Sequence, residues 1–181
     1  DTNYNLMFNN GSLAINKAAL TVTAANAAKT YDGQAYAGGN GVAYTGFVNG
    51  ETETTAGALG GAIVYGGTSQ GAKNAGSYVI SASGLTSGNY DLRYVDGALT
   101  VNKANATVTA NSGTVTYSGV QQSVTGFTAT GLVNGETTAV LTGVTAGGSG
   151  TNAGTYVTSA SGTDTNYNLM FNNGSLAINK A

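Results

Sequence analysis

The 181-residue chain contains no cysteine, no histidine, no proline and no tryptophan. Without cysteine, neither a disulfide nor a thiolate metal site can form. Without histidine, the chain lacks the commonest general base, so catalytic arrangements that pair histidine with serine or cysteine are excluded. Only carboxylates, lysine, tyrosine, serine and threonine could do chemistry. We therefore expect no enzyme, no catalytic residues and no cofactor.

Charge is also scarce. Charged residues make up 8% of the chain and the net charge is −2, whereas an ordinary soluble domain is roughly 25% charged. Nothing in this balance favours nucleic acid or an anionic membrane as a partner. No apolar run approaches the ~18 residues that a membrane-spanning helix needs. The uncharged, glycine-rich mixture suits a protein that is secreted unfolded across an outer membrane, so we expect an extracellular location, at the cell surface or in an extracellular matrix.

A long exact repeat dominates what is present. Residues 1–18 (DTNYNLMFNNGSLAINKA) recur letter for letter as residues 164–181, which indicates a duplication with a step of 163 residues. The last eight residues of this repeat, GSLAINKA, have a related copy, GALTVNKA at 97–104, which divides the 163-residue unit into two unequal modules. We predict a first module at 19–104, a second at 105–181, and a closing hairpin of a preceding repeat at 1–18.

The two modules share landmarks in the same order. These are TVTA at 21–24 and 107–110, TYDG at 30–33 and TYSG at 116–119, NGET at 49–52 and 134–137, and NAG at 74–76 and 152–154. The spacing between equivalent landmarks falls from 85 to 78 residues between NGET and NAG. We therefore expect a surface loop or an extra strand near residues 53–73 of the first module.

Short stretches alternate apolar and polar residues with a period of two, and glycine and asparagine interrupt them. This pattern predicts an all-β chain, with turns at Asn49-Gly50 and Asn134-Gly135. The joints between modules are too short to act as flexible tethers. The predicted fold is a series of antiparallel β-sandwich modules, Ig-like in the broad sense and stacked end to end; a β-grasp-like module is the alternative. Strands are expected at 20–24, 41–47, 62–66, 77–82, 106–110, 123–130 and 155–160.

The end of each module has the pattern of a β-hairpin. Asn173-Gly174 and Asp96-Gly97 are sequences that favour two-residue turns. Such a turn would pair Phe171 with Leu176 and Leu169 with Ile178, and place all four apolar side chains on one face. In the middle copy the same rule pairs Tyr94 with Leu99 and Leu92 with Val101. We predict a hairpin at both places.

Few residues are candidates for a binding site. Most of the eight acids adjoin glycine or asparagine at turns, where they favour local hydrogen bonds, and the joints carry lysine but no acid. We therefore expect no metal site, calcium included. Most of the 11 tyrosines are expected to pack half-buried. Tyr36, Tyr44 and Tyr65 lie where the second module is shorter or altered, so they are the candidate contacts for a glycan.

The ordered motifs KTYDG, GFVNGET, NAGSYVISASG and NYDLRYVDGALTVNKA resemble the YDG/MBG-type tandem repeats of filamentous-haemagglutinin-like bacterial adhesins. The resemblance covers 19–104 and 105–181. The second module departs from it, because Tyr117-Ser118-Gly119 replaces Tyr-Asp-Gly. The resemblance implies a large surface protein exported by two-partner secretion, in which these repeats form a stalk or spacer for adhesion or for a biofilm matrix.

Three functions stay open at this point. The first is a stalk or filament segment of an extracellular adhesin or biofilm fibre, whose partners are neighbouring identical repeats. The second is a module that binds cell-surface or matrix glycans, with avidity supplied by repetition. The third is a fibre subunit that polymerises by donating a strand or hairpin. It is motivated by the segment 1–18, whose apolar residues Leu6, Phe8, Leu13 and Ile15 need a cover.

Overall fold

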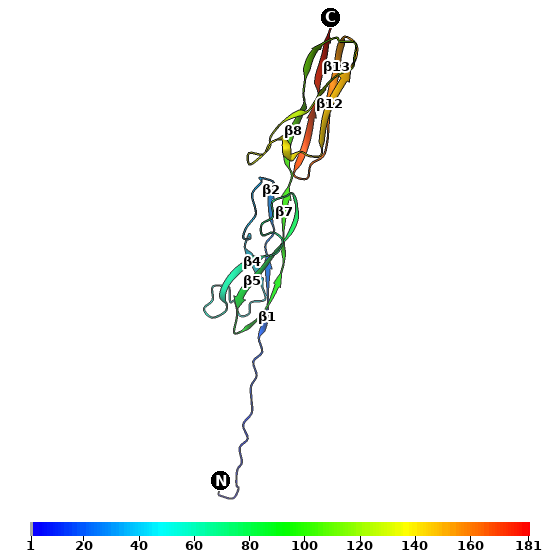
Figure 1. The fold of residues 1–181 in the computed structure, drawn as a ribbon. Helices are drawn as coiled ribbons and strands as arrows, with labels where there is room; N and C mark the ends of the chain where they lie inside the picture. The colour runs from blue at the N-terminus through cyan, green and yellow to red at the C-terminus, as the bar shows by residue number, and fades with distance from the viewer. Residues whose placement is uncertain (1) are drawn as a thin grey trace.

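The computed structural model describes residues 2–181 as a slender rod of β-strands, and residues 2–17 extend from its lower end (Figure 1). The described residues form fifteen strands and one short 3₁₀ turn, Thr138–Val140, and no α-helix. The all-β prediction is confirmed. Its physical basis is visible in β1 (Ala18–Ala24), where Leu20, Val22 and Ala24 are buried and the residues between them are less so.

The first seven strands form two sheets, with the orders β3-β1-β6 and β2-β7-β5-β4. Strands β5 and β6, which belong to different sheets, contact each other, as do β1 and β5. The two sheets therefore enclose apolar side chains between them. The remaining strands of this module are β2 (Ala27–Thr30), β3 (Val42–Thr45), β4 (Gly60–Gly66), β5 (Gly76–Thr86), β6 (Tyr90–Val95) and β7 (Gly97–Asn102).

The other eight strands repeat this arrangement, with the sheet orders β11-β8-β14 and β10-β12-β13-β15-β9. Contacts of β13 with β8 and β14 join the two layers. The predicted tandem β-sandwich fold is confirmed. The strands are β8 (Ala104–Ala110), β9 (Gly113–Thr116), β10 (Gln122–Thr125), β11 (Phe127–Thr130), β12 (Val144–Gly150), β13 (Gly154–Gly162), β14 (Tyr167–Asn172) and β15 (Gly174–Asn179).

The predicted hairpins are wrong. Strand β14 pairs with β8, whereas β15 pairs with β13 and β9 in the opposite sheet. Strands β6 and β7 separate in the same way. The chain therefore crosses from one layer to the other where a turn was expected, and Phe171 does not lie opposite Leu176. The alternating pattern that suits a hairpin equally suits one extended segment that changes sheets, so the pattern did not distinguish them.

Glycine is required at the crossings for space and not for a turn conformation. Neither Gly97 nor Gly174 has a positive φ. A Cβ at Gly97 would lie 2.5 Å from the carbonyl oxygen of Ala24, and one at Gly174 would lie 2.4 Å from that of Ala110. At these two glycines the closing segment of the module (β6–β7 or β14–β15) passes against the opening segment (β1–β2 or β8–β9). Only glycine permits so close an approach.

The opening and closing segments of each module run parallel over their whole length. In the first module, β1 pairs with β6 from Ala18↔Tyr90 onwards, and β2 pairs with β7 as far as Thr30↔Asn102, at one constant offset. In the second module, β8 and β9 pair with β14 and β15 in the same manner. The sheets are therefore mixed and not purely antiparallel as predicted. The chain enters each module at one end and leaves at the other.

The modules follow one another almost without a linker. Strand β7 ends at Asn102 and β8 begins at Ala104, so Lys103 alone lies between them. The predicted end-to-end stacking is confirmed, and Figure 1 shows the two modules in line along one axis.

Two predicted strands differ from those observed. The single strand expected at 123–130 is divided at Gly126, which has a φ of 85°, into β10 in one sheet and β11 in the other. The strand expected at 41–47 is confined to β3, and Gly46 beyond it has a φ of 118°. In both cases a glycine ends the pairing.

The extra length of the first module is mainly a loop and not an added strand. Strands β4 and β12 occupy equivalent positions, so most of the additional residues lie between β4 and β5. The side chain of Gln70 bonds both the N–H and the C=O of Gly38 at 2.8 Å, and Ser69 is fully buried. The loop is therefore packed onto the module.

We predict that Gly97→Val destabilises the first module by about 2 kcal/mol or more, because the added side chain would strike backbone oxygen atoms of two residues. Urea unfolding would measure the change. The control is Gly11→Val, because nothing lies within 4 Å of a Cβ at Gly11, so stability should stay within ~0.5 kcal/mol. A Gly97→Val chain that unfolds at the wild-type urea concentration would contradict the close-approach argument.

Candidate functional site

The most structured polar site among the described residues is the joint between the two modules. The Tyr31-Asp32-Gly33 motif at the upper end of the first module meets Asn134-Gly135-Glu136 of the second. Both motifs were recognised as landmarks because each module carries a version of them. The joint is therefore built from the parts of the sequence that repeat.

A single carboxylate bridges the modules. The Tyr31 hydroxyl donates to Oε1 of Glu136, and the Tyr167 hydroxyl donates to Oε2, each at 2.5 Å. The two rings meet edge to face, with centroids 5.4 Å apart and an interplanar angle of 82°. Tyr31 is 7% exposed and Tyr167 2% exposed. Charge-assisted hydrogen bonds of this kind are among the stronger polar contacts available to a protein.

The Asn134-Gly135 turn presents the second module's side of the joint. Asn134 has a φ of 53°, and the Glu136 N–H closes the turn on the carbonyl oxygen of Val133 at 3.0 Å, which confirms the predicted turn. The Gln34 amide donates to Oδ1 of Asn134 at 2.7 Å. A Cβ at Gly33 would lie 2.8 Å from that of Asn134, so the glycine of Tyr-Asp-Gly makes room for the neighbouring module.

The Asn-Ala-Gly motif of the first module, residues 74–76, makes a second contact across the joint, with Asn166 of the second module. The Ala75 N–H donates to Oδ1 of Asn166 at 2.9 Å, and the Asn166 amide donates to Oδ1 of Asn74 at 3.2 Å. Lys103 adds a bond from its ammonium to the carbonyl oxygen of Asp164 at 2.6 Å. Three recurring motifs thus converge on one joint.

Apolar packing continues through the joint. One cluster of buried side chains includes residues of both modules, so the hydrophobic core is not interrupted where the modules meet. Bending the rod at this point would expose apolar surface to water, which is unfavourable. The members of this cluster include Tyr31, Leu99, Val101, Ala104, Ala106, Leu141 and Tyr167.

Asp32 has a local role. Its Oδ1 accepts from the Lys29 ammonium at 2.7 Å and from the Gln34 N–H at 2.9 Å. The bond from Lys29 holds the pKa of the Asp32 carboxyl below its usual range. In the second module Val115 and Ser118 stand in the places of Lys29 and Asp32, so both members of the ion pair are replaced together. The aspartate therefore shapes its own turn.

The profile of the MBG domain (YGX type) family matches residues 20–100 and residues 106–177. The chain belongs to the MBG domain family. Each match falls on one of the two sandwiches, which confirms the predicted resemblance to MBG-type repeats. No protein of characterised function matched the chain.

The carboxylate at the joint changes the acidity of both MBG tyrosines that it binds. The hydrogen bond to Glu136 and then burial raise the pKa of Tyr31 to about 12. Burial and then the bond to Glu136 raise the pKa of Tyr167 to about 12. Because these values exceed the ordinary ~10 of tyrosine, the joint keeps its full stability below pH ~10 and loses it as pH rises towards 12.

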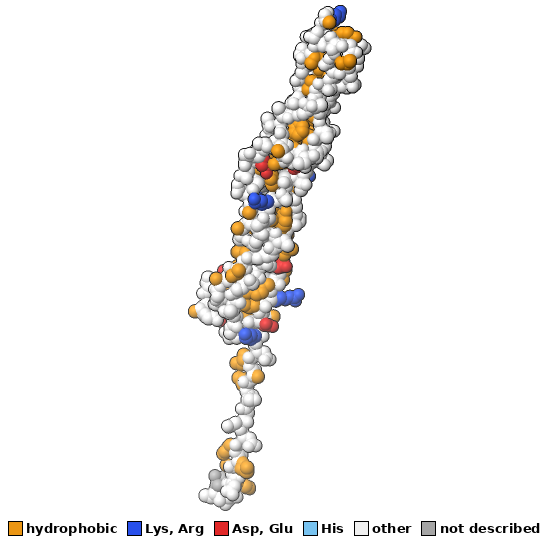
Figure 2. Space-filling model, in the orientation of Figure 1, with side chains coloured by type: hydrophobic (Ala, Val, Ile, Leu, Met, Phe, Trp, Pro, Cys, Tyr) orange, Lys and Arg blue, Asp and Glu red, His pale blue; other side chains and the backbone are white. Residues whose placement is uncertain are grey.

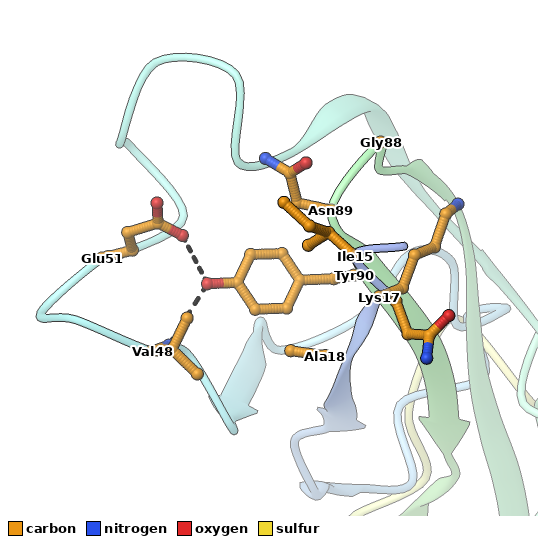
Figure 3. A pocket seen from close by; sticks show the side chains of 9 residues that line it. Ile15, Lys17, Ala18, Val48, Glu51, Gly88, Asn89 and Tyr90 are labelled. Atoms are coloured by element: carbon orange, nitrogen blue, oxygen red, sulfur yellow. Dashed lines mark hydrogen bonds between the residues drawn. The ribbon is translucent and has the colours of Figure 1, made fainter. Parts of the chain in front are cut away.

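The lower end of the first MBG module carries the same elements, with no partner module there among residues 2–181. The Tyr90 hydroxyl donates to Glu51 and accepts from the Val48 N–H at 3.2 Å (Figure 3). Tyr167, Glu136 and Val133 have the same arrangement at the joint. Within residues 2–181, however, Glu51 receives one tyrosine hydroxyl where Glu136 receives two.

The candidate glycan contacts pack against two core clusters. Tyr36 and Tyr65 are half-buried against the larger core cluster, and the Tyr65 ring lies directly on Gly39. Tyr44 packs beside Phe47, with ring centroids 5.6 Å apart, in the smaller cluster. Burial raises the pKa of Tyr44. Their glycan-binding role stays a prediction.

Sequence reasoning treated the tyrosines and Glu136 as ordinary packing and turn residues, and so missed the joint. A signal was present, since Tyr31, Asn134 and Glu136 recur as Tyr117, Asn49 and Glu51. Recurrence alone could not show that the members of one module bind those of the next. Among residues 2–181 there is no cluster of three or more His, Cys, Asp or Glu that could hold a metal ion, and no helix long and apolar enough to cross a membrane.

Alkaline titration followed by ultraviolet absorbance should show two tyrosines that ionise near pH 12. Joint stability should be constant below pH ~10 and fall above it, because ionised tyrosine would face the Glu136 carboxylate. Tyr31→Phe should remove one of the two late-ionising groups. If the group lost in Tyr31→Phe is instead one that ionises near the ordinary pH of ~10, the Glu136 contact does not form in solution.

Glu136→Gln should loosen the joint at a cost of roughly 1–2 kcal/mol, because the charge-assisted bonds to both tyrosines are lost. Since the chain has no cysteine, one spin-labelled cysteine can be introduced at an exposed position in each module. Double electron–electron resonance should then give a broader distance distribution for Glu136→Gln. Glu51→Gln is the matched control and should leave the distribution narrow; equal widths for the two variants would contradict the assignment.

Proposed function

We propose that this MBG chain is a load-bearing segment of an extracellular stalk or filament, in a bacterial adhesin or a biofilm-matrix fibre. The observation that carries the proposal is the joint, in which Glu136 and a shared apolar core hold consecutive modules without a linker. MBG domain repeats are consistent with a repeated module of surface proteins. A spacer needs joints that resist bending, whereas a catalytic domain has no such requirement.

The direction of the strands supports a mechanical role. The chain enters a module through its opening segment and leaves through its closing one, and these two run parallel and side by side. Tension along the chain therefore pulls the two segments in opposite directions. Because hydrogen bonds between strands lie across the strand axis, the load falls on the whole ladder at once and not on one bond at a time.

The parallel ribbon also sets the length of the repeat. Residues 90–103 and 167–180 are the stretches that carry the chain through the two modules. At about 3.3 Å per residue, each stretch spans about 45 Å, so a two-module unit advances about 90 Å. The partners in this role are neighbouring repeats of the same kind, and the low charge and absence of cysteine suit a location outside the cell.

Electron microscopy of native fibres, or of a long tandem array of the 163-residue unit, should show thin straight filaments with an axial repeat of about 90 Å. Short segments should scatter X-rays as rods whose length grows in proportion to the number of modules. Compact particles, or a chain that bends freely at every joint, would overturn the stalk function.

A further inference from the structure

The second module has almost no charge of its own. Residues 19–103 contain nine charged residues, whereas residues 104–163 contain one, Glu136. Both oxygens of that carboxylate accept tyrosine hydroxyls at the joint. In the view of Figure 2, the upper part of the rod is accordingly white and orange between its tip and the joint. Because soluble surfaces usually carry about 25–35% charged residues, this module lacks the side chains that keep protein surfaces apart.

The five-stranded sheet β10-β12-β13-β15-β9 gives this module its broader sheet surface. In β13, Tyr156, Thr158 and Ala160 are more buried than the residues between them, so the alternate side chains point away from the core. We call the outer surface of this sheet the hydroxyl face. Its exposed residues on β12 and β13 include Thr145, Ser149, Thr155, Val157, Ser159 and Ser161.

The register of the strands places small uncharged side chains in rows across the hydroxyl face. Thr145 lies opposite Ser161, and Gly147 lies opposite Ser159. On the neighbouring strand pair Ser123 lies opposite Ser149. Side chains this small let a second sheet approach to about 10 Å, and their hydroxyls can bond one another across the gap.

We propose that the hydroxyl face is a lateral contact between two copies of this chain, each packing this face against the same face of the other. Stalks would thereby associate side by side. The inference goes beyond the stalk function, which needs only contacts along the axis of one chain.

The charge of the face favours a second copy as its occupant. When a surface packs against itself, each residue meets residues of the same set, so charged side chains of one sign would repel. The outward residues of β12 and β13 carry no charge, and no ion has to leave water. The hydroxyls that lose water can bond hydroxyls of the other copy. Val157, which is 66% exposed, adds apolar area that such packing would cover.

The size of the face suits a weak but specific contact. Five strands at about 4.8 Å spacing give a width of about 24 Å, and strands of four to nine residues give lengths of about 13–30 Å. The flat area is then about 500 Å² per copy, or about 1,000 Å² for two. That total lies at the low end of specific interfaces, so a single contact should dissociate readily.

Repetition of the unit strengthens the contact. In a tandem array the hydroxyl face recurs once in each 163-residue unit. Once two arrays meet at one face, the next faces are held at an effective concentration of roughly millimolar. Long arrays should therefore associate at concentrations at which the 181-residue chain is mainly monomeric.

Sedimentation equilibrium of the 181-residue chain should show a weight-average mass that rises above the monomer as the concentration approaches roughly 1 mM. A tandem array of the 163-residue unit should form side-by-side bundles at micromolar concentration, visible by electron microscopy. Bundling should be nearly independent of salt from roughly 0.05 to 0.5 M, because the face is uncharged. Arrays that stay single overturn the proposal, as do arrays that bundle only when a neutral polysaccharide is added.

Ser159→Lys tests the face directly. It places a positive charge on each of two identical surfaces, so the association constant of the 181-residue chain should fall at least about tenfold. Thr128→Lys is the matched control, because Thr128 is exposed on β11 in the other sheet of the same module, and it should leave the constant unchanged. Since the net charge of the chain is −2, an added lysine brings it nearer to zero, so general repulsion cannot explain a loss. Equal losses for the two variants would contradict the assignment.

Mixing opposite charges supplies a test by rescue. Arrays that carry Ser159→Lys, and arrays that carry Ser159→Glu, should each stay single, whereas an equal mixture should bundle at low salt because opposite charges then meet. A mixture that stays single would overturn the pairing of like faces. Single filaments that keep the axial repeat of about 90 Å would sink the lateral contact and leave the stalk function standing.

Discussion

The carboxylate of Glu136 is the contact on which the arrangement of the two modules depends. It accepts hydroxyl hydrogens from tyrosines of different modules at 2.5 Å each, and both tyrosines are buried. A carboxylate with both oxygens occupied can accept such bonds in only a few directions, so it fixes orientation as well as distance. The continuous apolar core then opposes separation, and the short connection at Lys103 leaves no slack.

The second constraint is the close crossing of the opening and closing segments. Because Gly97 and Gly174 lack side chains, one strand can pass directly over the backbone of another and enter the facing sheet. That crossing allows the parallel ribbon to run through both layers of a module. It follows that the entry and exit points lie at opposite ends, and that modules in series extend as a rod (Figure 1). Linear growth is therefore a property of each module's internal topology.

Sequence reasoning succeeded where the signal was local and failed where the choice of partner was distant. The alternation in β1, β5, β8 and β13 located strands correctly, and the positive φ of Asn49 and Asn134 follows from asparagine-glycine turn chemistry. The hairpin prediction failed because Leu169, Phe171, Leu176 and Ile178 satisfy two pairings equally well. Tyr36, Tyr44 and Tyr65 lie where the two modules differ, whereas the joint is formed by residues that the modules share.

By itself the sequence determined that the chain is a tandem repeat of two related β modules, and it excluded histidine and thiol chemistry. Periodicity and exact recurrence carry that information within short windows. Only the tertiary structure decided which strands pair and which motifs meet across the joint. Those choices depend on side chains more than 100 residues apart, such as Tyr31 and Glu136. Their contact depends on how whole sheets pack and not on any local preference of the residues concerned.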